Sequence, residues 1–377
     1  MKFGKVGLAI ALVLVLAASA FAADTVKIGV FLPLTGQMGY GGQLELDGLK
    51  MAHKEAPKIL GKTVELIVVD NKSDKVEAAN AVKRLIEKEK VVAIIGTYGS
   101  SLAMAGGEVS EKAGIPQLGT SCTNPLVTQG KKYIFRTCFI DPFQGAGAAT
   151  YAFQKMKAKN AAVLIDVSQD YSVGLANFFE KSFTKMGGKI VAKLNYNSGD
   201  QDFTAQLTEI ISKKPDVLFI PSYFAEGAII MKQVGELGGK FKIMGGDAMD
   251  NPEIVKIGGK AVEGFAYTTF PYDPTMKGMS PIAKKFTENW KKAFPGKDPN
   301  VNAALGYDSY MLILDAIKRA GKAEPKLIRD QLEATKNFPG VTGSTTMNAT
   351  HDAEKPVGIM MIQDGKRVFV DVVQPKL

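Results

Sequence analysis

The sequence predicts an α/β protein built of two Rossmann-like lobes, each a mostly parallel sheet flanked by helices. Short apolar segments with strand character alternate with amphipathic helical segments along most of the chain. The alternation forms one block and then starts again after Pro142. A chain of 377 residues also has the length of about two ordinary domains. Two blocks of this kind fit two lobes better than one very wide sheet.

The first residues predict export from the cytoplasm. Lys2 and Lys5 precede an apolar run over residues 6–18, and Ala20-Phe21-Ala22 supplies small residues before a cleavage point. This pattern is typical of a secretory signal peptide, so residues 1–22 are expected to be removed and the protein to reside in the periplasm. The run is shorter than the roughly 20 residues of a membrane-spanning helix, which argues against the alternative of an uncleaved anchor. Because no Cys lies near the cleavage point, no lipid attachment is expected.

Composition favours a soluble globular protein and argues against a nucleic-acid partner. The chain is 46% hydrophobic and 23% charged, and its net charge of +9 is spread over isolated lysines and pairs such as Lys284-Lys285. It has no Arg-rich stripe interleaved with aromatic residues, as nucleic-acid binding would require. Two cysteines, Cys122 and Cys138, and two histidines are too few for a structural zinc site, so no metal is expected. In an oxidising compartment the cysteines either pair or stay reduced, and their spacing does not decide which. If they stay reduced, Cys138 is expected to be a small hydrophobic residue on a strand, and Cys122 is expected in a loop.

The first block predicts strands and helices in alternation up to residue 118. Its first helix is expected at residues 42–56. Its second helix follows Asp74, which can cap it, and should end near residue 86. Its third helix should begin near Ser100. The strands, whose apolar runs suit a buried parallel sheet, are expected at 26–32, 64–69, 91–95 and 115–118.

The second block repeats the pattern between residues 143 and 244. Right-handed crossovers between parallel strands are expected from such βαβ units. The predicted elements, in chain order, are a helix at 143–157, a strand at 161–165, a helix at 173–186, a strand at 190–194, a helix at 203–213, a strand at 217–220, a helix at 225–237 and a strand at 241–244.

The last hundred residues depart from the alternation. Three helices, at 280–293, 302–320 and 325–335, follow one another without clear strands, and a hairpin at 358–362 and 368–372 turns at Asp364-Gly365. Helices without strands of their own must pack on a sheet formed earlier in the chain. The chain is therefore expected to return to the first lobe and then to the second, crossing near 139–142, 267–273 and 345–356. The first lobe is expected to comprise 23–141 and 271–348, and the second 142–270 and 349–377.

Loops at the carboxyl ends of strands are the places to expect a ligand in such sheets. In the loop after the first strand, Gly39-Tyr40-Gly41 is followed by Leu44 where the dinucleotide fingerprint needs a third Gly, so no NAD site is predicted. The loops at 96–101 and 119–125 carry hydroxyls at helix starts and no Lys or Arg. They can bind a carboxylate through neutral donors and helix dipoles. The alternative is ordinary N-capping by Ser100 and Thr123.

The second block offers the opposite chemistry at its strand ends. Tyr171, Tyr223 and Asp247 each follow a predicted strand. A carboxylate between such loops can receive an ammonium group, and tyrosine rings can cover the ammonium by hydrogen bonding or cation–π contact. The alternative for Asp247 is the turn position that Asp often occupies.

Several motifs in this order resemble the leucine/isoleucine/valine-binding family, the type I periplasmic binding proteins of branched-chain amino-acid ABC transporters. The resemblance covers residues 24–377 and is carried by Ile28-Gly29-Val30 with Thr35-Gly36, Ile94-Ile95-Gly96, Ala113-Gly114-Ile115-Pro116, Thr123-Asn124-Pro125 and Phe135-Arg136-Thr137. It implies two lobes joined by a three-stranded hinge, with a ligand cleft between them. It also implies a binding protein and not an enzyme, without cofactor or catalytic residues, that delivers an amino acid to an inner-membrane ABC permease.

The resemblance also implies a role for individual residues. Ser100 and the loop Ser121-Cys122-Thr123 would bind the ligand carboxylate, and Thr123 with Asp247 would bind the ammonium group. Tyr171 and Tyr223 would close from the second lobe, and Asp141 and Gln144 would lie at the hinge edge of the cleft. Where leucine-binding members carry a Trp near the first Gly-rich loop, this chain has Tyr40, so the choice of ligand stays open. The family's disulfide does not carry over to Cys122 and Cys138.

Other functions remain to be weighed against an aliphatic amino-acid ligand. The same fold could bind an amide, a short peptide or an aromatic acid, or serve a sensor, and Asp247 argues against a ligand without an ammonium group. A hydrolase is not expected, because neither His53 nor His351 lies near a plausible nucleophile and no G-x-S-x-G motif is present. The protein is expected to act as a monomer.

Overall fold

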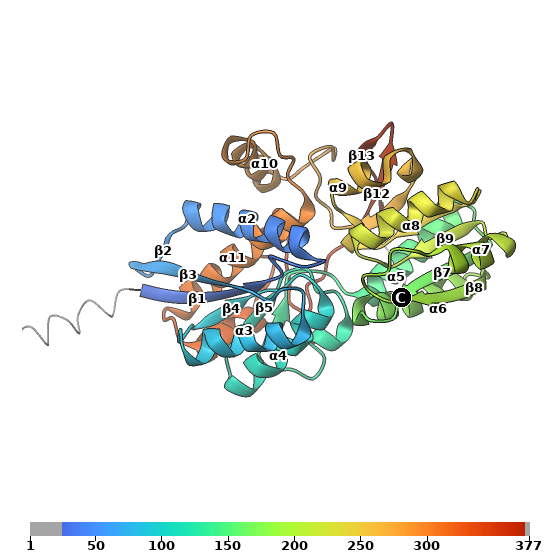
Figure 1. Ribbon diagram of the computed structural model, residues 1–377. Coiled ribbons are helices and arrows are strands. Elements are labelled where there is room, and N and C mark those ends of the chain that lie inside the picture. The colour runs from blue at the N-terminus through green and yellow to red at the C-terminus, as the bar shows by residue number, and fades with distance from the viewer. Residues whose placement is uncertain (1–24, 374–377) are drawn as a thin grey trace, which may run out of the picture.

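The computed structural model describes residues 25–373, which form two lobes lying side by side (Figure 1). The predicted signal peptide, residues 1–22, lies outside the described residues. Each lobe has its own sheet, one of six strands and one of seven. The α/β class and the two flanked, mostly parallel sheets are confirmed. The exact residues at which each lobe ends stay a prediction.

The first sheet is centred on β1 (Thr25–Leu32), which is buried along most of its length. It pairs in parallel with β3 on one side and β4 on the other, while the short β2 runs antiparallel to β3. The strands lie across the sheet in the order β2 (Lys58–Ile59), β3 (Lys62–Asp70), β1, β4 (Ala93–Ile95), β5 (Gln117–Gly119) and β6 (Ile134–Arg136).

Helices from both ends of the chain cover this sheet. One face packs on α3 (Lys75–Glu87) and α4 (Ser100–Ala113). The Asp74 side chain caps α3 by accepting hydrogen bonds from the N–H groups of Val76 and Glu77, as the sequence predicted. The other face packs on α2 (Gly39–Glu55), α10 (Pro281–Ala293), α11 (Val301–Ala320) and α12 (Pro325–Glu333).

The two glycines at the contact of α2 and α11 explain how closely these helices approach. A Cβ on Gly48 would lie 1.8 Å from the Ala303 carbonyl oxygen, and one on Gly306 would lie 2.1 Å from the Glu45 carbonyl oxygen. Only glycine fits at both positions. Helix α11, which lies more than 200 positions after β1 in the sequence, is thereby seated as an integral part of the first lobe (Figure 1).

The second sheet is parallel at its centre and antiparallel at one edge. Its order is β13 (Lys366–Val373), β12 (Val357–Gln363), β11 (Ala266–Thr269), β10 (Lys242–Gly245), β9 (Val217–Ile220), β7 (Asn160–Asp166) and β8 (Lys189–Tyr196). The predicted hairpin of β12 and β13 joins antiparallel to β11.

Helices cover both faces of the second sheet as well. One face packs on α5 (Asp141–Thr150), continued by a π-helical turn at Tyr151–Lys155, and on α6 (Asp170–Lys185). The other packs on α7 (Thr204–Ser212), α8 (Phe224–Glu236) and α9 (Glu253–Gly258). Three 3₁₀ turns, at Pro125–Val127, Asp247–Met249 and Gly259–Val262, complete the elements.

Two details differ from the sequence-based prediction. Residues 267–269, predicted to start a crossing, belong to β11 and are fully buried, since the antiparallel hairpin needs a strand on which to pair. Cys138, expected on a strand, lies in a bend two residues beyond the end of β6. The chain passes between the lobes after β6, after β11 and after α12, which gives the three-stranded hinge.

Candidate ligand-binding site between the lobes

A small cavity lies where the carboxyl ends of both sheets meet. Its volume, about 10 Å³, is about the space of one water molecule. The lobes therefore have to separate before anything larger can enter. The cavity is lined from the first lobe by Tyr98, Gly99, Ser100, Ser121 and Thr123, and from the second by Tyr171, Tyr223, Asp247 and Ala248.

The first lobe contributes hydroxyls and the start of a helix. Ser100 is the first residue of α4, and its hydroxyl accepts a hydrogen bond from the Asn124 N–H at 3.1 Å. The N-cap of α4 is Gly99, and the N-cap of the following 3₁₀ turn is Asn124, so neither Ser100 nor Thr123 serves as an N-cap. The N–H groups of the first turn of α4 have no acceptor within the helix, and its dipole favours negative charge there. This wall suits a carboxylate.

The second lobe contributes one carboxylate. Asp247 is 4% exposed, and its Oδ1 accepts a hydrogen bond from the Tyr171 hydroxyl at 2.9 Å. Its backbone N–H donates to Oε1 of Gln144 at 2.8 Å. Burial raises the pKa of Asp247 to about 6, and the hydrogen bond from Tyr171 opposes that rise. A buried carboxylate of this kind is stabilised when a cation binds beside it.

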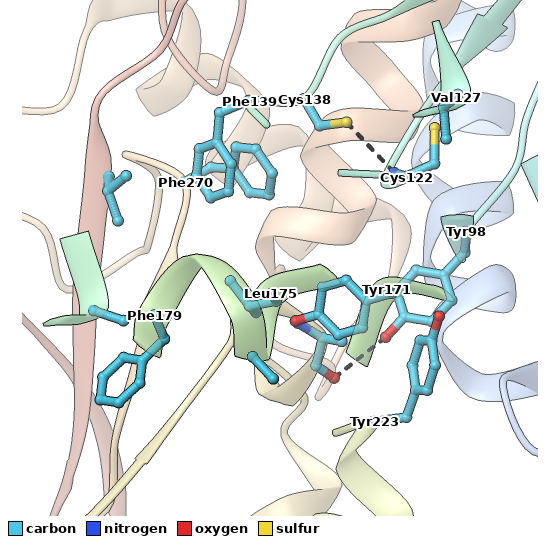
Figure 2. Close-up of a cluster of buried hydrophobic side chains, with 14 of the residues drawn as sticks. Tyr98, Cys122, Val127, Cys138, Phe139, Tyr171, Leu175, Phe179, Tyr223 and Phe270 are labelled. Atoms are coloured by element: carbon cyan, nitrogen blue, oxygen red, sulfur yellow. Dashed lines mark hydrogen bonds between the residues drawn. The ribbon is translucent and has the colours of Figure 1, made fainter. Parts of the chain in front are cut away.

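Three tyrosine rings gather at the cavity (Figure 2). The ring centroids of Tyr98 and Tyr223 are 5.6 Å apart, as are those of Tyr171 and Tyr223. The Tyr98 hydroxyl donates across the cleft to the Ala248 carbonyl at 3.2 Å. The Tyr223 hydroxyl is buried and has no hydrogen-bond partner among residues 25–373. It is therefore available to a ligand.

Tyr98 and Ala248 are lining side chains that the sequence did not predict, and Tyr98 is the larger of them. Tyr98 stands in the loop after β4, two residues before Ser100, so its position at a strand end was the available signal.

Two predicted site residues do not line the cavity. Tyr40 is 38% exposed and contacts Phe224 of the other lobe, with ring centroids 6.0 Å apart. The Cys122 thiol packs on Gly119, where a Cβ would lie 2.3 Å from the sulfur. Hydrogen bonding to Cys138 and burial raise the pKa of this thiol. Both cysteines are buried free thiols.

Asp141 and Gln144 lie behind the cavity, at the start of α5. The backbone N–H of Asp141 donates to the Thr123 carbonyl at 2.9 Å, and Nε2 of Gln144 donates to Oδ1 of Asp141 at 3.0 Å. Oε1 of Gln144 accepts from Thr268 at 2.7 Å as well as from Asp247. Burial and the neighbouring Asp247 raise the pKa of Asp141. The backbone of Asp141 and the side chain of Gln144 thus connect the hinge to both walls of the cavity.

Arg136 is a second residue whose role was not foreseen. Its fully buried guanidinium donates to the carbonyl oxygens of Cys122 at 2.6 Å and Asn124 at 2.8 Å. It therefore fixes the backbone of the loop that carries Ser121 and Thr123. The sequence showed Arg136 only as part of a motif, because the three-dimensional position of its carbonyl partners cannot be deduced from spacing.

The charge balance of the cavity is one-sided. Its lining contains one carboxylate and no Lys or Arg. Within residues 25–373, no cluster of three His, Cys, Asp or Glu side chains is placed to hold a metal ion. None of the helices in that range has the length and apolar character needed to cross a membrane.

Comparisons with known proteins agree with this architecture. A leucine binding protein, LivK, from Thermotoga maritima superimposes with a TM-score of 0.90 at 45% identity, covering 93% of this chain and 99% of that one. The branched-chain amino acid transporter substrate binding protein LivJ from Streptococcus pneumoniae, in complex with isoleucine, gives a TM-score of 0.87 at 32% identity, covering 93% and 100%.

A relative from Pseudomonas aeruginosa, a leucine-, isoleucine-, valine-, threonine- and alanine-binding protein, is 29% identical over 336 residues, which are 87% of each chain. The sequence profile of one family matches residues 25–367, nearly the whole described chain. The chain belongs to the periplasmic binding protein family.

Proposed function

We propose that this protein is the substrate-binding component of an ABC importer and that it binds an α-amino acid with an aliphatic side chain between its lobes. One observation carries the proposal: a buried carboxylate, Asp247, faces hydroxyls and a helix N-terminus in a cavity without Lys or Arg. A zwitterion complements both walls. Its ammonium group would neutralise Asp247, and its carboxylate would take the donors of Ser100, Ser121 and Thr123.

Closure of the lobes is the proposed working motion. Hinge closure around a ligand is the established behaviour of periplasmic binding proteins. Because the closed cavity has a volume of only about 10 Å³, an amino acid must enter an open form. It then favours closure only to the extent that it binds the closed form more tightly. Contacts to Ser100 on one lobe and to Asp247 on the other supply that difference, since only the closed form makes both.

Two kinds of observation support an aliphatic side chain on the bound amino acid. The lining offers the faces of Tyr98, Tyr171 and Tyr223, which provide apolar area, and it offers no second charge for an acidic or basic side chain. The Pseudomonas aeruginosa relative is named for leucine, isoleucine, valine, threonine and alanine, and the Thermotoga maritima structure is named for leucine. The Streptococcus pneumoniae structure is a branched-chain amino acid binding protein in complex with isoleucine.

The cellular role follows from the family and from the sequence. We propose that residues 1–22 direct export and are removed, and that the mature protein acts in the periplasm as a monomer. The closed, loaded form would be the one recognised by an inner-membrane permease. The amino acid would leave chemically unchanged.

A thermal-shift screen of ligand-stripped protein tests the proposal. The ligands are the common amino acids, their amides, and aromatic acids, because a bound ligand raises the melting temperature by mass action. A selective rise with Leu, Ile or Val supports the proposal, and the same ligands should give no rise with Asp247→Ala. A rise confined to amides or aromatic acids would overturn the ammonium assignment and favour the alternative ligand class.

A further inference from the structure

The lobes also meet outside the cavity, at the first residue of α6. Asp170 of the second lobe lies 3.2 Å from Nζ of Lys75, the first residue of α3 in the first lobe. Its Oδ2 accepts a hydrogen bond from the Ser101 hydroxyl at 2.8 Å, and its carbonyl accepts one from Nδ2 of Asn124 at 2.8 Å. Three elements of the first lobe thus converge on one residue of the second.

Ser101 supplies a helix cap from the opposite lobe. The local N-cap residue of α6, Gln169, makes no side-chain capping bond. Instead the Ser101 hydroxyl accepts a hydrogen bond from the Asp170 N–H at 3.1 Å, while donating to the carboxylate of the same residue. The first N–H groups of a helix have no acceptor within the helix and need one from outside it. Here that bond exists only when the lobes are together.

None of these side chains lines the cavity. Asp170 lies on the second lobe, and its three partners Lys75, Ser101 and Asn124 lie on the first. Separation of the lobes therefore breaks all the contacts between Asp170 and these partners. Tyr171, the next residue after Asp170, does line the cavity and bonds Asp247. The cluster therefore holds the start of α6 in the position that presents Tyr171.

We propose that Lys75, Ser101, Asn124 and Asp170 form an interlobe latch that stabilises the closed form without touching the ligand. This inference rests on the proposed function, since it assigns part of the ligand affinity to these residues. Stabilising the closed form lowers the apparent dissociation constant by the same factor. An exposed ion pair adds little to the stability of the closed form, and hydrogen bonds add somewhat more. The loss of the Ser101 hydroxyl should therefore raise the dissociation constant about three- to tenfold.

The latch has a part that salt should weaken and a part that salt should leave intact. The side chains of Lys75 and Asp170 are 54% and 46% exposed, so added salt screens their attraction. Ser101 is 3% exposed and Asn124 is 4% exposed, so their hydrogen bonds are protected. Lys75→Met should therefore reduce the salt dependence of affinity, whereas Ser101→Ala should lower affinity at every salt concentration.

The test compares Ser101→Ala and Lys75→Met with a control on the same helix. Glu180 of α6 pairs with Lys193 at 2.7 Å within the second lobe, so Glu180→Gln removes a similar half-exposed ion pair that does not bridge the lobes. Calorimetry gives the dissociation constant for the amino acid found in the screen, and stopped-flow gives its release rate. Circular dichroism confirms that each variant is folded.

The latch is supported if Ser101→Ala raises the dissociation constant and the release rate while Glu180→Gln changes neither. Equal affinities for all variants overturn it. If the wild-type protein binds no amino acid, the proposed function fails. The latch is then tested on its own by measuring interlobe distances in the free protein with electron paramagnetic resonance. A shift toward longer distances in Ser101→Ala then supports the latch, and identical distance distributions overturn it.

Discussion

Nε of Arg136 lies 2.7 Å from Oδ1 of Asp352, and both side chains are buried. Arg136 is the last residue of β6 and holds the cavity loop, whereas Asp352 belongs to the last crossing between the lobes. The hydroxyl of Thr128 joins them by donating to the same Oδ1 at 2.7 Å. One buried ion pair thus connects the loop of Ser121 and Thr123 to a strand of the hinge.

Breaking that pair should be costly. Asp352→Ala leaves the guanidinium buried without its anion, and breaking a buried pair from one side costs about 3–5 kcal/mol in the free energy of unfolding. Urea unfolding measures the loss. The control is Glu253→Gln, which removes the surface pair with Lys256 and should leave the stability nearly unchanged. Similar losses for the two variants would contradict the role given to Asp352.

Protonation of Asp247 should make ligand-free stability depend on pH. The folded-state pKa is about 6, above the ordinary 3.8, so the folded form binds this proton more tightly than the unfolded form does. The contribution of this proton to the free energy of unfolding is fully present below pH 3.8 and is lost as the pH rises through about 6.

The variant Asp247→Asn removes that titration. We expect its melting temperature to exceed that of the wild type at pH 7 and to converge with it near pH 4, with amino-acid binding lost throughout. Scanning calorimetry of ligand-free protein over about four pH units around the shifted pKa of Asp247 checks this. Parallel pH profiles for the two proteins would rule out the shifted pKa of Asp247.

The two cavity tyrosines of the second lobe should respond differently to loss of the hydroxyl. Tyr223→Phe removes a buried hydroxyl that has no partner among the described residues, so stability should hold or rise slightly. Tyr171→Phe removes the bond to Asp247 and should cost about 1.5–3 kcal/mol at pH 7, as for hydrogen bonds to charged groups. Urea unfolding of ligand-free protein compares them, and an equal loss in both variants would contradict the assignment.

Both thiols should be unreactive toward thiol reagents in the native protein. Cys122 and Cys138 are 0% exposed and free, so a thiol reagent should label neither until denaturant is added, when both should react. Val76→Cys serves as a positive control, because Val76 is 67% exposed and a thiol there should react at once. A denatured wild-type protein that reacts only after reduction would instead reveal a disulfide.

The sequence predicted most of the fold because its local patterns agree with the final structure. Asp74 caps α3 where a cap was expected, and the boundaries of β9 match the predicted strand at 217–220. Strand ends also predicted much of the cavity wall, since Ser100, Thr123 and Asp247 each follow a strand and converge. The carboxyl ends of parallel strands lie at one edge of a sheet, so sequence order carries this information.

What the sequence did not predict depends on contacts between distant segments. Ser101 caps α6 from 69 positions away, and Thr128 reaches Asp352 across 224 positions. No periodicity or spacing encodes such pairs. The thiol of Cys122 was placed in the site together with its neighbours, yet in an extended loop adjacent side chains point in different directions, and this one faces Gly119.

The seating of α11 against α2 bears on the order in which the protein is assembled. The Tyr307 hydroxyl donates to Glu55 across 252 positions, and the Tyr310 hydroxyl donates to the Ala56 carbonyl across 254. The first sheet therefore cannot bury one of its faces until nearly the whole chain has been made. Such non-local contacts slow folding, so the first lobe should not become native until α11 has been made. The start of the chain therefore stays without its native packing partners through most of synthesis.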